Sequence, residues 1–137
     1  MAAMPEPQAL KGVRVLLVDD DDDTRDIIER VLARRGAEVA ALASAPAALL
    51  RFAEEKFDVL LVDIMMPGMD GYEFIRKIRA LPADQGGNVP AATLTARVVT
   101  DDRMESVLAG FQGHVKKPVD AQELTHVVAT LAGRGKA

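Results

Sequence analysis

The chain has 137 residues, among them no cysteine and no tryptophan, and its 17 basic and 21 acidic residues give a formal net charge of −4. This length fits one domain with a substantial core, and the lack of cysteine excludes disulfides and thiolate metal sites. The acidic balance disfavours nucleic acid as a direct partner, and no apolar run is long enough to cross a membrane. The N-terminus does not have the pattern of a signal peptide, so we expect a cytoplasmic protein.

Short apolar runs alternate with amphipathic segments along most of the chain. Residues 1–11 precede this pattern and contain two prolines among small and polar residues, which predicts a flexible leader. We assign residues 12–132 to one domain and residues 133–137 to a C-terminal tail. The expected strand and helix pairs are Val13–Val18 with Thr24–Arg35, Glu38–Leu42 with Pro46–Glu55, Asp58–Val62 with Tyr72–Ala80, Val89–Leu94 with Asp101–Ala109, and Gln112–Val115 with Ala121–Leu131.

Five such pairs predict an α/β fold, because short apolar strands separated by helices are typical of a parallel sheet covered on both faces. We expect a doubly wound, five-stranded sheet of the flavodoxin-like (βα)5 kind, with strand order 2-1-3-4-5. In this order the carboxyl ends of strands one and three lie side by side. Ligands of such sheets bind at that point.

Five consecutive aspartates, residues 19–23, follow the first strand, and Asp63 ends the third. Asp19, Asp20 and Asp63 should therefore converge at one edge of the sheet, where their like charges repel unless a cation lies between them. Oxygen ligands without histidine or cysteine favour Mg²⁺, and we expect Mn²⁺ to substitute. The other three aspartates are expected to cap the following helix and to favour solubility.

Two further polar side chains reach the same edge from strands four and five. Thr95 ends the "TLT" segment and Lys117 ends "VKK". A carboxylate can attack a phosphoryl group and form an acyl phosphate when cationic groups stabilise the transferring oxygens. Asp63 is the candidate nucleophile, whereas Lys116 should point to the opposite face and remain solvated.

The segments "VLLVDD", "LLVDIMMPGMDGYEFIRKIR", "TLTA" and "KKPVD", taken in this order, resemble the receiver domain of two-component response regulators. The resemblance covers roughly Gly12 to Leu131. It implies that Asp63 accepts a phosphoryl group from a histidine kinase or a histidine phosphotransfer protein. The domain would promote only its own phosphorylation and dephosphorylation, and so would not be an enzyme with a separate substrate.

The resemblance also implies roles for the surrounding groups. Asp20, Asp63 and the Met65 main-chain carbonyl would bind Mg²⁺ directly, with Asp19 acting largely through water. Thr95 and the Ala96 amide would contact the phosphoryl oxygens, as would Lys117, and the Lys117–Pro118 bond is expected to be cis. The side chains of Met65, Met66 and Met69 are expected to be packing or loop residues.

In this family a threonine and an aromatic residue three positions before the lysine move together on phosphorylation. Here the second position is His114. Either it fills the switch position as a smaller ring, or its titration near neutrality adds a pH dependence. Histidine here, with the lead-in "LKGVRVLLVDD", is also similar to receivers attached to hybrid histidine kinases.

Output is expected through a protein surface made of the fourth helix, fifth strand and fifth helix. Val98 and Val99 either belong to this partner surface or pack on the fourth helix. Arg97 and Met65 flank the site and are expected to tune dephosphorylation. The sequence as given shows no kinase, phosphotransfer or DNA-binding segment, so we expect either a freestanding regulator or a receiver of a larger protein.

Three other classes of protein fit the sequence less well. A haloacid-dehalogenase-like phosphatase needs a second aspartate two residues after its nucleophile, where this chain has Met65. A phosphate-independent interaction module would not require the set of acidic, hydroxyl and ammonium groups. A flavodoxin-like electron carrier would meet repulsion between the acidic edge and the phosphate of its cofactor.

Overall fold

The computed structural model describes residues 8–96, 107 and 109–133, and most of the predicted helix Asp101–Ala109 lies outside them. None of the helices in this described part is long and apolar enough to cross a membrane. The elements are β1 (Arg14–Val18), α1 (Asp22–Arg34), β2 (Glu38–Leu42), α2 (Ala45–Glu54), β3 (Val59–Asp63), α3 (Gly71–Arg79), the 3₁₀ turn η1 (Ala83–Gln85), β4 (Ala91–Thr95), β5 (Gly113–Lys116) and α5 (Ala121–Leu131).

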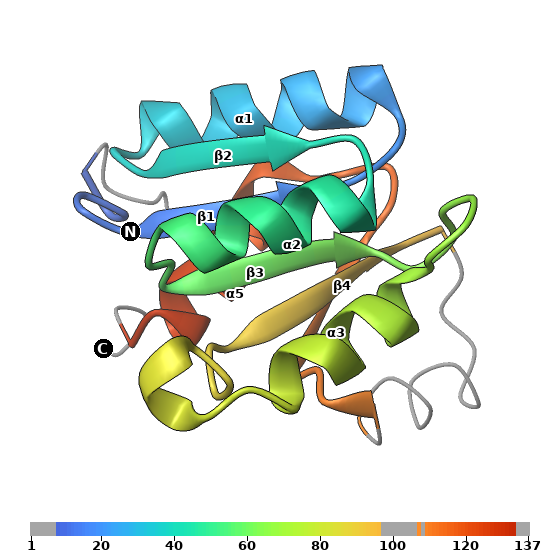
Figure 1. Cartoon of the computed structure of the whole chain (residues 1–137). Helices are drawn as coiled ribbons and strands as arrows, with labels where there is room; N and C mark the ends of the chain where they lie inside the picture. Colours follow the sequence, from blue (N-terminus) through green and yellow to red (C-terminus); the bar gives the residue numbers. More distant parts are fainter. Residues whose placement is uncertain (1–7, 97–106, 108, 134–137) are drawn as a thin grey trace.

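The five strands form one sheet in the order β2-β1-β3-β4-β5, which confirms the predicted topology. Every neighbouring pair is parallel, and β1 pairs with β2 on one side and β3 on the other (Figure 1). All carboxyl ends consequently meet at one edge. Because β1 and β3 are adjacent while their helices leave on different faces, this edge opens between them.

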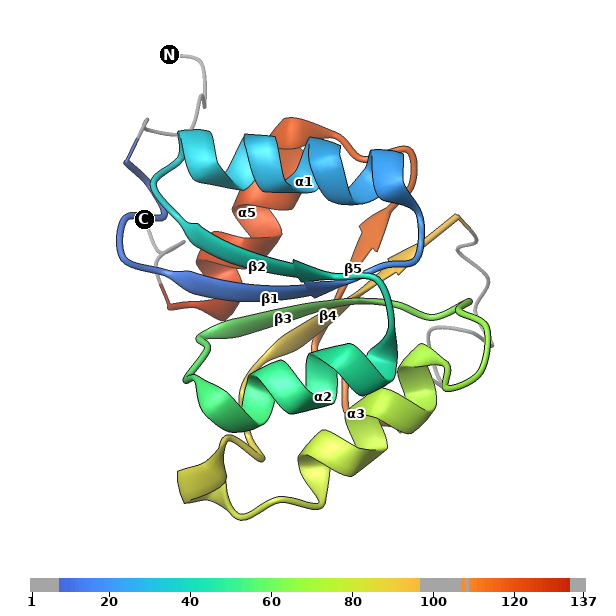
Figure 2. The ribbon, with the colours of Figure 1, turned by 45° about the horizontal axis from the view of Figure 1, so that its top comes forward.

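Alternate residues of the central strands enter two separate cores. Leu16 and Val18 of β1 pack under α2 and α3 with Phe74, while Val15 and Leu17 point to the other face. The second core is completed by helical side chains that recur at three- and four-residue spacing, namely Ile28, Leu32, Leu124 and Val128. Figure 2 shows α1 and α5 on one side of the sheet and α2 and α3 on the other.

Several elements begin or end one or two residues away from the predicted positions. At α1 a side-chain cap sets the start of the helix. Asp21 is the N-cap of α1, because its carboxylate accepts hydrogen bonds from the Thr24 amide, at 3.1 Å, and from the Thr24 hydroxyl. These hydrogen bonds lower the pKa of Asp21. Asp22 and Asp23 occupy the first helical turn. The predicted capping role is thus confirmed for Asp21, while Asp22 and Asp23 lie where their charge suits the helix dipole.

Leu10, which the sequence analysis assigned to the flexible leader, is fully buried in the core on the α1 and α5 side. Its amide donates to the Arg35 carbonyl at 2.8 Å, and its own carbonyl accepts from Val13 at 2.9 Å. The packed part of the chain therefore includes Leu10, ahead of the predicted start at Gly12. A single apolar residue among prolines and polar residues has no periodicity, so the sequence pattern did not reveal it.

Replacing Leu10 by alanine should lower the free energy of unfolding by about 2–4 kcal/mol, as for other buried leucines. Leu50 on α2 is 72% exposed and provides the matched control, so Leu50→Ala should change it by less than about 0.5 kcal/mol. Urea unfolding of both variants would measure the difference. Equal effects of the two substitutions would contradict the packing of Leu10.

Candidate functional site

Three carboxylates converge where β1 and β3 end. Val18 and Val62 are register partners, so Asp19 and Asp63 follow them side by side. Carboxylate oxygens of Asp19, Asp20 and Asp63 lie within 4.8 Å of one another. Asp19 is fully buried, Asp63 is 6% exposed and Asp20 is exposed at the rim. The structure thus brings together the three aspartates that the sequence placed at this edge.

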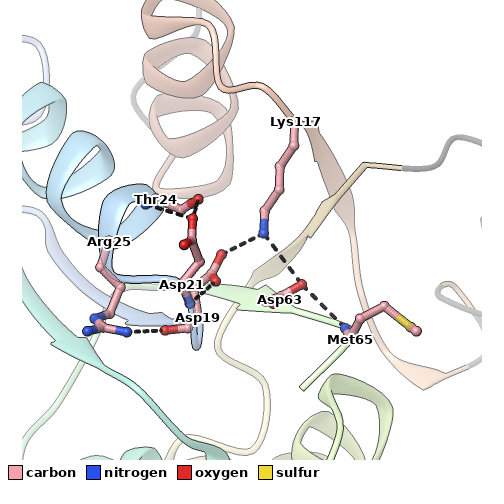
Figure 3. Close-up of polar contacts among 7 residues, drawn as sticks. All are labelled: Asp19, Asp21, Thr24, Arg25, Asp63, Met65 and Lys117. Atoms are coloured by element: carbon pink, nitrogen blue, oxygen red, sulfur yellow. Dashed lines mark hydrogen bonds and ion pairs between the residues drawn. The ribbon is translucent and has the colours of Figure 1, made fainter. Parts of the chain in front are cut away.

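Lys117 reaches into the same cluster from the end of β5. Its Nζ lies 2.8 Å from Asp19 Oδ2 and 3.7 Å from Asp63 Oδ1, between the two carboxylates (Figure 3). The Lys117 amide donates to the Thr95 carbonyl at 2.8 Å, which ties the backbone here to the end of β4. The Lys117–Pro118 bond is cis, as predicted.

The electrostatics of the cluster follow from burial and like charge. Burial raises the pKa of Asp63, the charge of Asp19 raises it further, and Lys117 offsets only part of this, so that the pKa is about 7. Burial lowers the pKa of Lys117, but its contact with Asp19 and the charge of Asp63 outweigh this and raise it. The lysine therefore stays charged, whereas Asp63 without a cation is half protonated near neutral pH.

The loop after β3 holds Asp63 from the other side. The Met65 amide donates to Asp63 Oδ1 at 3.3 Å, while the Met65 side chain is 79% exposed. Met66 is buried and Met69 packs against the core, which confirms that they are packing residues. A Cβ on Gly71 would lie 2.6 Å from the Asp63 carbonyl oxygen, so glycine allows α3 to start close against the end of β3.

Thr95 and Ala96 lie at the same edge, on the next strand. Leu94 is the register partner of Asp63, and Thr95 follows it half-buried, with Ala96 exposed. Lys116 is exposed, and its amide donates to Glu123 Oε1 at 3.3 Å, away from the acidic cluster. Lys117 thus reaches the acidic cluster while Lys116 is exposed, in agreement with the solvated position predicted for Lys116.

His114 lies half-buried in β5, opposite its register partner Thr93. Its Nδ1 is 2.7 Å from the hydroxyl oxygen of Thr93, which is fully buried. The proposed switch and pH roles of His114 remain predictions. Arg97, Val98 and Val99, for which tuning and partner-binding roles were predicted, lie outside the described part of the chain.

One residue of the site escaped the sequence analysis. Arg25, on the first turn of α1, donates from Nη1 to the Asp19 main-chain carbonyl at 2.8 Å and forms an ion pair with Asp22. The only signal in the sequence was an acidic residue three positions before a basic one, and this pattern is common on solvated helix faces.

The donor set fits a small hard cation. All three candidate ligands are carboxylates, two of them are largely buried, and the described residues offer no histidine or sulfur ligand within the cluster. Asp19 Oδ2 contacts the Lys117 ammonium without a well-directed hydrogen bond to any described residue. Mg²⁺ prefers such oxygen ligands and neutralises their repulsion.

The sequence from residue 15 to residue 129 matches the response regulator receiver domain, and the chain belongs to this family. It is therefore a phosphoacceptor module of two-component signalling. Receiver domains bind Mg²⁺ in an acidic pocket and interact with histidine kinases or phosphotransfer proteins. The strand order and the cluster of three aspartates agree with this assignment.

Individual relatives include both short and long proteins. An uncharacterized 14.6 kDa protein of Leptolyngbya boryana is 40% identical over 88% of this chain and 91% of its own length. The sensor protein GacS of Pseudomonas syringae pv. syringae is 32% identical over 93% of this chain, which spans only 14% of GacS. A similar solved structure is the receiver of the sensor histidine kinase PA1611 of Pseudomonas aeruginosa, with a TM-score of 0.80 and 31% identity over 89% of this chain and 98% of that one. That structure was solved with a magnesium ion coordinated in its active site cleft.

The raised pKa of Asp63 predicts how stability depends on pH without a divalent cation. Between about pH 4 and pH 7 the folded protein holds a proton on Asp63 that the unfolded chain releases, so stability falls as pH rises through this range. Asp63→Asn removes this loss. The variant should gain stability relative to wild type between pH 5 and pH 8, by on the order of 2 kcal/mol.

Urea unfolding in EDTA at pH 5 and pH 8 would measure this gain. Asp84→Asn, at an exposed position of η1, is the matched control and should show the same difference from wild type at both pH values. An Asp63→Asn difference that does not grow with pH would refute the raised pKa.

Proposed function

We propose that Asp63 is the residue that accepts the phosphoryl group. The observation that supports this most strongly is the position of Lys117, whose Nζ lies 3.7 Å from Asp63 and 2.8 Å from Asp19. Asp19 is fully buried and has its carboxylate paired with the lysine, while Asp20 is exposed at the rim. Asp63 is the carboxylate that combines a fixed position with partial access from the edge of the sheet.

Asp63 must be ionised to act as a nucleophile. We propose that Asp19, Asp20, Asp63 and the Met65 carbonyl hold Mg²⁺, or Mn²⁺ in its place. The bound ion would neutralise the repulsion among the carboxylates and the charge on the phosphoryl oxygens. With its pKa of about 7 lowered in this way, Asp63 would be fully ionised at neutral pH.

In the proposed reaction an Asp63 carboxylate oxygen attacks phosphorus while the bond from phosphorus to the phosphohistidine nitrogen breaks. Lys117 stabilises the charge on a phosphoryl oxygen, and the Thr95 hydroxyl and the Ala96 amide donate hydrogen bonds to others. Hydrolysis of the acyl phosphate releases phosphate and restores Asp63. The chain turns over only its own phosphoryl group, which separates it from an enzyme with an independent substrate.

The proposed donor is a sensor histidine kinase or a histidine phosphotransfer protein in the cytoplasm. We infer that phosphorylation shifts the balance between existing conformations of the face formed by β5, α5 and the helix predicted at Asp101–Ala109, most of which lies outside the described residues. We infer that this face binds the downstream target. His114 supports this location, because it lies in β5 with its ring against Thr93. The similarity to GacS and to a protein of this chain's own size is compatible with either a hybrid kinase or a freestanding regulator.

Incubation with acetyl phosphate and MgCl₂, followed by measurement of the intact mass, tests the assignment. Wild type should gain one phosphoryl group, and Asp63→Asn should gain none. Lys117→Met should slow the gain by roughly 100-fold, because it removes a preorganised cation from the transferring oxygens.

Lys116→Met is the matched control, since Lys116 is the neighbouring lysine and lies exposed. It should be phosphorylated at the wild-type rate. Phosphorylation of Asp63→Asn at the wild-type rate would show that another residue is the acceptor.

A further inference from the structure

The turn that carries Asp19 and Asp20 is held by contacts to each polar group of Asp19. The Asp19 amide donates to the Leu42 carbonyl at 3.1 Å, and the Asp21 amide donates to Asp19 Oδ1 at 2.9 Å. The other carboxylate oxygen contacts Lys117. The remaining group, the Asp19 carbonyl, accepts the hydrogen bond from Arg25 Nη1 at 2.8 Å.

This carbonyl belongs to the same peptide unit as the Asp20 amide. A peptide unit is planar, so a fixed carbonyl direction also fixes the line from the Asp19 Cα to the Asp20 Cα. Asp20 itself is exposed, and its carboxylate must still meet those of Asp19 and Asp63. The direction in which Asp20 leaves the backbone therefore depends on what holds the preceding carbonyl.

Arg25 is well placed to do this from α1. Its Nη1 donates to the Asp19 carbonyl (Figure 3). Its side chain is 20% exposed, and its Nη2 pairs with Asp22. The backbone carries it close, because the Arg25 amide donates to the Asp21 carbonyl at 3.1 Å at the start of the helix. A planar guanidinium can serve both acceptors at once, whereas the single nitrogen of lysine is a point charge.

We propose that Arg25 is a positioning residue for cation binding, which orients the Asp19–Asp20 peptide so that Asp20 faces the other two carboxylates. This inference rests on the proposed function of the site as a Mg²⁺ centre. It adds a residue that touches neither the cation nor the phosphoryl group. Arg25 acts through the backbone of its neighbours.

The positive charge of Arg25 should weaken cation binding, whereas its positioning role should strengthen it. This difference makes the proposal testable. A positive guanidinium near the three carboxylates repels a divalent cation, so neutralising it should tighten binding if charge alone mattered. In that case Arg25→Lys, which keeps the positive charge, should leave Mg²⁺ binding unchanged. Loss of orientation, by contrast, should weaken binding in both variants, by roughly 10-fold as for other groups that orient metal ligands.

Titration of MgCl₂ into the full chain, followed by the NMR amide signals, would measure the Mg²⁺ dissociation constant of wild type, Arg25→Lys and Arg25→Gln. Arg30 lies on the same helix and pairs with Asp26 at 3.2 Å on the exposed side, so Arg30→Lys and Arg30→Gln are the matched controls. Urea unfolding in EDTA would measure stability separately, because a purely structural role lowers the free energy of unfolding without changing the affinity of the folded protein.

A dissociation constant about 10-fold higher in both Arg25 variants, with wild-type values in both Arg30 variants, is the expected result. Arg25 variants within twofold of wild type, or tighter binding by Arg25→Gln, would overturn the positioning role while the proposed function stood. Wild type that neither binds Mg²⁺ nor gains a phosphoryl group would overturn the proposed function and this inference together.

Discussion

The mutual repulsion of three carboxylates at one edge of the sheet is the constraint to which the site is adapted. Asp19 and Asp63 are brought side by side by the register of β1 and β3, and both are largely buried. Lys117 lies between them but leaves the pKa of Asp63 at about 7. Because one lysine does not neutralise three carboxylates, the site is suited to bind a divalent cation and then an anionic phosphoryl group.

The same arrangement provides a route by which the proposed phosphorylation of Asp63 would affect the surface proposed to bind partners. Lys117 directly follows β5, its amide is hydrogen-bonded to Thr95 at the end of β4, and His114 lies three residues earlier, within β5. A phosphoryl group on Asp63 would compete with Asp19 for Lys117 and would draw on Thr95. Changes at the edge of the sheet can thus reach β5 and α5 without any movement of the central strands, whose side chains fill both cores.

The sequence was sufficient for the topology and for most of the cluster. Alternating apolar runs and helical spacing identify the strands, and parallel pairing then requires Asp19, Asp63 and Lys117 to meet. It could not reveal that Asp19 is buried against Lys117 while Asp20 stays at the rim, because strand alternation does not apply beyond the last paired residue. Arg25 was missed for a related reason, since its hydrogen bond to a main-chain carbonyl leaves no trace in residue type. Leu10 was missed because a single buried residue does not form a repeating pattern of apolar positions.

The central claim is that burial and the repulsion among the carboxylates hold the pKa of Asp63 well above its ordinary value. Titration of the Asp63 carboxyl carbon by NMR, first in EDTA and then in saturating MgCl₂, tests it most directly. We expect the Asp63 carboxyl to have a pKa near 7 in EDTA and a clearly lower pKa with Mg²⁺. A pKa close to that of an ordinary aspartate, about 4, under both conditions would contradict it.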